Sequence, residues 1–190
     1  MKPQTIRRRK FLGAAAAAAA AAGALSCGTR KSPWRFLSAE EAAALAAMAD
    51  RIIPADQDPG AASSGAVNFI DRHLMGHFKR FRQTYRDGLA ALERTARTMF
   101  GQKFAGLDAG VQDRLLKLLE SGAASRVIWN QVAPRQFFDM VVGHTMQSYY
   151  GDPRHGGNRD AASWRMLGVP LVPVRGRDQY DFTKPGGRTA

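Results

Sequence analysis

Cysteine is almost missing from this sequence: the 190 residues contain one, Cys27. A single thiol cannot form an intrachain disulfide, and it cannot supply the cysteine sets that bind structural zinc, attach c-type haem or hold iron–sulfur clusters. The chain also lacks a nucleophile elbow, a dinucleotide-binding fingerprint and a phosphate-binding loop. We therefore expect no cofactor in this chain, and any electron carrier that works with it is expected to belong to another protein.

Acidic residues are also scarce. The chain has 16 Asp and Glu against 28 Lys and Arg, which gives a net charge of +12. Five of the bases precede Cys27 and no acid does, so the rest of the chain carries +7. The densest later run of bases is Arg72, Lys79, Arg80, Arg82 and Arg86. Such a run is more typical of a solvated helix face than of a nucleic-acid groove, and we predict no nucleic-acid partner.

A long hydrophobic run is missing as well. The apolar stretch over residues 11–25 is rich in alanine and falls short of the about 20 strongly apolar residues that a membrane span needs. It follows a basic start and precedes small residues, an order that indicates a targeting segment over residues 1–27.

Within this segment the residues Arg8-Arg9-Lys10-Phe11-Leu12 resemble the twin-arginine export motif. Arg8, Arg9, Phe11 and Leu12 match it, while Arg7 replaces the usual Ser or Thr. The motif implies export of a folded protein by the twin-arginine machinery and hence a periplasmic location. Two fates of the leader stay open: lipidation of Cys27, in a poor lipobox, or ordinary cleavage after small residues. Residues 28–37 read as a basic, unstructured tether.

Helical periodicity dominates the rest of the chain. A capping box, Ser38 with Glu41, predicts the first helix start, and Pro54 predicts its end. We predict an all-α domain of about six helices without strands. The expected helices cover residues 38–53, 65–75, 78–99, 107–120, 134–150 and 160–167. The stripe from Phe78 to Met99 is expected to lie in the core.

Metal sites find little support. His73 and His77 are four residues apart, but no third ligand is near them in the sequence, and Gly76 lies between. Asp50, Asp56 and Asp58 lack the spacing of a calcium loop and are expected to cap turns. We therefore predict no metal in this chain.

The most distinctive stretch is residues 137–170. A helix beginning at Pro134 leads to a glycine-rich loop over residues 151–159, and Gly168 closes a short helix after it. Such a loop is either a rigid structural turn or a functional surface. His144, Tyr150, Asp152 and His155 could also form a small acid–base site, which would make the chain a stand-alone periplasmic enzyme.

This stretch resembles the C-terminal signature of the gluconate 2-dehydrogenase subunit 3 family. The residues that carry the resemblance are Phe137, Phe138, His144, Thr145, Tyr150, Asp152, Pro153, Gly156, Gly157, Asn158, Trp164, Gly168 and Pro170. The family's N-terminal pattern matches A-D-R-I-I-P-A-D over residues 49–56, Pro59-Gly60-Ala61 and Phe69-Ile70-Asp71. The resemblance covers residues 38–170, the expected helical small-subunit domain.

The resemblance implies an accessory, non-catalytic subunit of a membrane-associated dehydrogenase for sugars, sugar acids or alcohols. In such complexes a large subunit of the glucose-methanol-choline type binds FAD, leaves the cytoplasm bound to the small subunit, and passes electrons to a cytochrome c subunit with haem c. The candidate partner surface is the set His144, Tyr150, Asp152, Pro153, Gly156, Gly157, Asn158, Trp164, Gly168 and Pro170.

Two further features stay open. The Pro-rich tail, residues 171–190, is expected to be extended, and it either folds back over its own core or lies along a partner. A basic envelope-associated binding protein is the other alternative, and it requires bases that are concentrated on one face.

Overall fold

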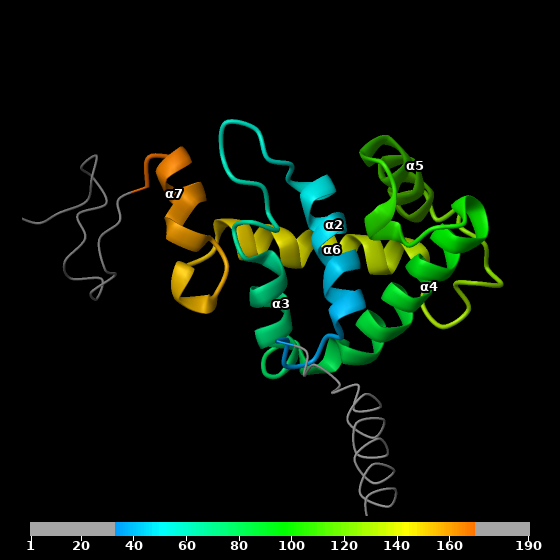
Figure 1. Ribbon diagram of the computed structural model, residues 1–190. Coiled ribbons are helices and arrows are strands. Elements are labelled where there is room, and N and C mark those ends of the chain that lie inside the picture. The colour runs from blue at the N-terminus through cyan, green and yellow to red at the C-terminus, as the bar shows by residue number, and fades with distance from the viewer. Residues whose placement is uncertain (1–32, 170–190) are drawn as a thin grey trace, which may run out of the picture. The chain divides into compact units, whose positions relative to one another are not determined.

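A computed structural model of the protein describes residues 33–169 (Figure 1). Within this range all regular elements are helical and no strand occurs, which confirms the all-α prediction. The α-helices are α2 (Ala39–Ile52), α3 (Ala66–Leu74), α4 (Arg82–Phe100), α5 (Ala109–Glu120), α6 (Pro134–Tyr150) and α7 (Ala162–Met166). Short 3-10 turns are η1 (Lys79–Phe81), η2 (Phe104–Gly106), η3 (Pro153–His155) and η4 (Arg159–Ala161). The predictions for Arg8, Arg9, Phe11, Leu12, Cys27, Pro170 and the tail fall outside the described residues.

Helix α6 is the centre of the fold. It contacts α2, α3, α4, α5 and α7, and Figure 1 shows it in yellow with α2 crossing it. Its Phe137 and Val141 side chains are completely buried. A Cβ at Gly88 of α4 would lie 2.0 Å from Cδ2 of Phe137, so glycine at this position lets the ring reach the α4 backbone.

Local signals set the limits of α2 as expected. The Glu41 amide donates to Ser38 Oγ over 3.2 Å, and the Ser38 amide donates to Glu41 Oε2 over 2.8 Å, which confirms the capping box. The acids that follow cap turns, as predicted: Asp50 accepts from the Ala62 amide and Asp56 from the Asp58 amide.

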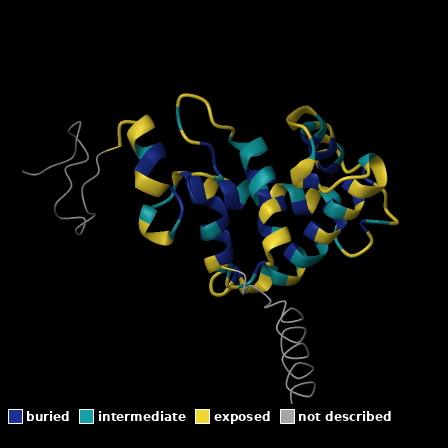
Figure 2. Ribbon diagram, viewed as in Figure 1, coloured by how far each residue is buried: buried dark blue, intermediate teal, exposed yellow. Residues whose placement is uncertain are grey.

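The long helix differs from its prediction at its start, while Gly101 ends it. Phe78 precedes the 3-10 turn η1, and the regular helix α4 begins only at Arg82. Phe78, Tyr85 and the leucines of α4 are buried, but Met99 is 51% exposed, so its assignment to the core was wrong. Figure 2 shows exposed residues along the outward side of α4. The last turn of α4 faces solvent because the chain turns away at Gly101, whose φ is +70°.

The expected unstructured tether is wrong for residues 35–37. Their backbone amides donate to the carboxylate of Asp71 in α3, over 2.7 Å from Arg35 and 2.9 Å from both Phe36 and Leu37. Asp71 is 2% exposed, and a buried carboxylate needs such donors. The start of the described chain is therefore fastened to α3.

Candidate functional site

The glycine loop after α6 is organised by one side chain, Asn158. It is fully buried, its Nδ2 donates to the Gly151 carbonyl over 2.8 Å, and its Oδ1 accepts from the Ser163 amide over 3.0 Å. One amide thus joins the end of α6 to the first turn of α7 and braces the loop.

Two adjacent glycines allow the loop to lie close to the helices. Gly156 has a φ of +96°, and its carbonyl accepts from Asn68 Nδ2 over 2.7 Å. Gly157 lacks a positive φ; its Cβ would instead lie 2.3 Å from Ser148 Oγ and 2.4 Å from the Ser148 carbonyl. Close approach to α6 is therefore the reason for glycine at this position.

The loop also contains backbone conformations that side chains oppose. Asn158, Asp160 and Ala161 have φ values of 42°, 56° and 53°. A left-handed conformation costs roughly 1–2 kcal/mol per non-glycine residue, less for Asn and Asp. Long-range hydrogen bonds offset this cost, among them the Arg159 amide to the Ser64 carbonyl (2.9 Å) and Tyr149 Oη to the Pro59 carbonyl (2.9 Å).

At the start of the loop, the Asp152 carboxylate accepts hydrogen bonds from Arg154. The Arg154 amide donates to Asp152 Oδ1 over 2.9 Å, and Arg154 Nε donates to Oδ2 over 2.9 Å. These hydrogen bonds lower the pKa of Asp152 to about 2. Pro153 occupies the first position of η3, where its missing N–H is harmless. Asp152 is therefore ionised at neutral pH and serves as a turn cap rather than as a general acid.

His144 does not reach the loop. It is 6% exposed, stacks on Phe78 with ring centroids 3.9 Å apart, and its Nδ1 is 3.0 Å from Tyr85 Oη. Burial, then the nearby charges of Arg80 and His73, lower its pKa to about 4. Burial also raises the pKa of Tyr85 far above its usual range. His144 is thus a neutral core residue, and its inclusion in an exposed partner surface was wrong.

The proposed acid–base site is not assembled by these residues. His144 lies against Phe78, Asp152 pairs with Arg154, and the ring of His155 packs edge-on to His73 at 6.0 Å. Each residue is engaged with a different neighbour. The arrangement gives no support to the stand-alone enzyme.

The exposed surface of this region includes several large apolar side chains as well as charged ones such as Arg159 and Arg165. Tyr150 (39%), Met166 (42%), Leu167 (58%) and Val169 (39%) are the exposed large apolar side chains at the end of α6 and the end of α7. Trp164 is only half-buried, and its Nε1 donates to the Tyr150 carbonyl over 3.0 Å. We call Tyr150, Trp164, Met166, Leu167 and Val169 the apolar end.

Gly168 ends α7 as predicted, with a φ of +67°. Figure 2 shows the first turn of α7 buried and its last turn exposed. In this short helix Ala162 and Ser163 are buried, whereas Met166 and the following Leu167 face solvent.

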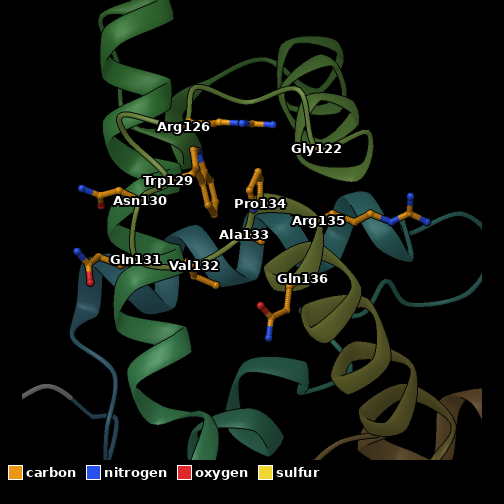
Figure 3. A pocket seen from close by; sticks show the side chains of 10 residues that line it. All are labelled: Gly122, Arg126, Trp129, Asn130, Gln131, Val132, Ala133, Pro134, Arg135 and Gln136. Carbon is orange, nitrogen blue, oxygen red and sulfur yellow. The ribbon is translucent and has the colours of Figure 1, made fainter.

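A separate hollow of about 420 Å³ lies at the other end of α6 (Figure 3). Its wall includes Trp129, Pro134 and the two arginines Arg126 and Arg135. No acid or histidine is among its lining residues. Because α6 has 17 residues, at about 1.5 Å each, this hollow is far from the glycine loop and does not contribute to it.

Some residues of the site escaped the sequence analysis. Asn68 holds the loop by donating to the Gly156 carbonyl. Gly65 lets the loop come close to the start of α3, because a Cβ at Gly65 would lie 2.9 Å from the same carbonyl oxygen. Asn68 shares a face of α3 with Arg72 rather than with the apolar residues, and no local pattern marked it. Gly65 carried no signal beyond its place before a helix.

Metal-binding and membrane-spanning features were also sought in the described residues. Over residues 33–169, no group of three or more His, Cys, Asp and Glu could hold a metal ion. None of the helices in this range is both long enough and apolar enough to cross a bilayer.

Comparison with known proteins supports one assignment. Searches of curated proteins and of solved structures found no match. The family model described as gluconate 2-dehydrogenase subunit 3 matches residues 39–170, more than half of the chain. This range begins at the first residue of α2 and includes the whole glycine loop and α7. The chain therefore belongs to the gluconate 2-dehydrogenase subunit 3 family.

Proposed function

We propose that this protein is the non-catalytic small subunit of a flavin-dependent dehydrogenase of the glucose-methanol-choline type. The complex would oxidise a sugar, a sugar acid or an alcohol, with FAD in the large subunit and haem c in a cytochrome subunit. The observation that carries the proposal is the family match over residues 39–170, whose C-terminal motif forms a rigid loop. In this role the chain supports the export, folding and stability of the catalytic subunit.

The apolar end is the surface we assign to the large subunit. Its side chains are exposed, while the loop beneath them is fixed by Asn158 and by contacts to α3. Exposed apolar groups on a rigid support are typical of protein interfaces. Of the family motif, the buried Asn158 and Gly157 act below this surface, and Tyr150 and Trp164 lie in it.

The leader assigns the complex to the periplasm in this proposal. Arg8 and Arg9 would direct the folded small subunit, with its flavoprotein bound, through the twin-arginine machinery. Attachment to the membrane would follow through the complex or through a lipid on Cys27.

Export can be tested with the double substitution Arg8→Lys and Arg9→Lys. We expect both this protein and the flavoprotein to stay in the cytoplasm, as measured by fractionation of cells that express both. Arg7→Lys is the matched control, because it makes the same change outside the pair. If the flavoprotein still reaches the periplasm in the double variant, shared export is wrong.

The docking surface has its own test. Leu167→Ser removes an exposed apolar side chain from the apolar end, whereas Val127→Ser removes one that is 83% exposed elsewhere. Co-purification with the flavoprotein should fall for Leu167→Ser and persist for Val127→Ser. Equal yields from the two variants would show that the apolar end is not the interface with the flavoprotein.

A further inference from the structure

A second surface, formed by the end of α3 and the turn into α4, concentrates positive charge; at one edge Arg72 reaches Gly156 of the glycine loop. Residues 72–86 join α3 to α4 and contain five Arg and Lys but no acid. Arg72, His77, Lys79 and Arg80 are exposed, and so is Met75 between them, at 47%. We call these five residues the cationic face.

The cationic face is held together by the aromatic rings below it. The rings of His77 and Phe81 lie 5.7 Å and 6.1 Å from that of Phe78, and the Arg80 guanidinium sits 4.6 Å above the Phe81 ring. Arg82 donates from Nε to the Leu74 carbonyl, which ties the end of α3 to the start of α4. These contacts hold the His77 ring and the Arg80 guanidinium at the turn between α3 and α4.

The charges on this face are not cancelled by neighbours. The ion pairs found over residues 33–169 involve Arg51, Arg86, Arg97, Lys103, Arg135 and Arg154. Arg72, Lys79 and Arg80 take part in none of them. Because like charges gathered on one surface raise the local potential, this face attracts anions from a distance.

The chain enters the described structure on the same side. Asp71, the residue before Arg72, holds the amides of residues 35–37, and the Phe36 ring lies 5.6 Å and 4.2 Å below the guanidinium groups of Arg82 and Arg86. Figure 1 shows this beginning, in blue, beside the loop that follows α3. The six residues from Cys27 to Pro33 reach at most about 20 Å. A leader or lipid in the membrane would therefore keep this side of the protein near the bilayer.

We infer that the cationic face binds the anionic phospholipid headgroups of the membrane. Lys and Arg near an anionic leaflet attract the phosphates, and an exposed apolar side chain among them enters the headgroup boundary. Met75 supplies that apolar group, and its Sδ is 3.0 Å from an Arg82 nitrogen. An acidic protein would match the charges alone. The membrane also accounts for Met75 and for the entry of the leader on this side.

The geometry leaves the apolar end free for a protein partner. The cationic face belongs to residues 72–80, and the apolar end belongs to the last turns of α6 and α7. Two chemically different surfaces thus serve two partners, and the inference about lipids does not depend on the identity of the dehydrogenase.

The test measures binding of the full chain to vesicles of phosphatidylcholine, alone or mixed with phosphatidylglycerol. The variant Lys79→Gln with Arg80→Gln is compared with Arg114→Gln and Lys117→Gln, two exposed bases of α5. Each base near an anionic surface strengthens binding roughly fivefold. We therefore expect the face variant to partition on the order of thirtyfold more weakly into the mixed vesicles at low salt, and the control pair to change little. The leader is the same in all variants, and thermal melting checks their folding.

Three results would overturn the inference. Wild-type binding could be the same with and without phosphatidylglycerol, or the two double variants could lose binding equally. Alternatively, the face variant could bind mixed vesicles normally but fail to co-purify with the flavoprotein, which would assign the cationic face to an acidic protein. The Leu167→Ser variant should keep vesicle binding, so a failed partner interaction and a failed lipid interaction are distinguishable.

Discussion

Phe137 in the middle of α6 and Asn158 in the glycine loop are both fully buried, but they stabilise their surroundings through different interactions. Phe137 fills space between α4 and the turn that carries Trp129, with the Trp129 ring 5.7 Å away. Asn158 satisfies backbone groups on two sides of a chain reversal. The helical core therefore responds to lost volume, and the loop responds to lost hydrogen bonds and to added atoms.

The largest effect is expected in the core. Phe137→Ala should reduce the free energy of unfolding by about 3–5 kcal/mol, because Phe137 is completely buried and its loss opens a cavity. Phe138→Ala is the matched control, since its ring is only partly buried and should cost less. Chemical denaturation of both variants measures the difference. Equal losses would show that the core packing around α6 is looser than described.

Asn158→Ala tests the loop by deletion. The Ser163 amide and the Gly151 carbonyl would lose their partner, at about 1–3 kcal/mol for each buried group. We expect a loss of about 2–4 kcal/mol in total, together with reduced co-purification of the flavoprotein. A variant that melts like the wild type would refute the bracing role of Asn158.

Gly157→Ala tests the loop by addition. The new Cβ would meet the backbone carbonyl of Ser148 at 2.4 Å, which no side-chain rotation relieves. Overpacking of this kind costs about 1–3 kcal/mol. Gly110→Ala in α5 is the control, because the space around Gly110 is open and a helical alanine should be neutral or slightly stabilising. The melting temperature should fall for Gly157→Ala and stay the same or rise slightly for Gly110→Ala; an equal fall in both variants would contradict the close approach.

The smallest expected effect is the contribution of His144 to the pH dependence of stability. Its pKa is lowered to about 4 in the folded protein, below the ordinary value of 6.5, so the unfolded chain binds more protons between these values. This contribution to stability is complete above pH 6.5 and is lost progressively as the pH falls toward 4. His144→Phe should be less stable at neutral pH but should lack this part of the pH dependence. Denaturation at several pH values measures it, with the exposed His77→Gln as a control that keeps the wild-type slope.

The local signals in the sequence predicted much of the fold. The capping box at Ser38, Pro134 at the start of α6 and the glycine at position 101 mark helix ends through interactions between near neighbours. Such interactions depend on residues that are close in the sequence, so the sequence alone is enough to predict them. The glycine loop was recognised for a similar reason, because few residue types suit tight turns.

The sequence by itself determined the helical periods, their ends and the resemblance to a family. Only the tertiary structure decided the functions of single residues. His144 lies in the core because Tyr85, 59 positions away, offers its hydroxyl, and residues 35–37 are ordered because Asp71 is buried beside them. Gly157 is required by Ser148 of α6 rather than by its own φ. Contacts between distant segments leave no local pattern, since each partner alone fits many surroundings, and they exist only once the helices have packed.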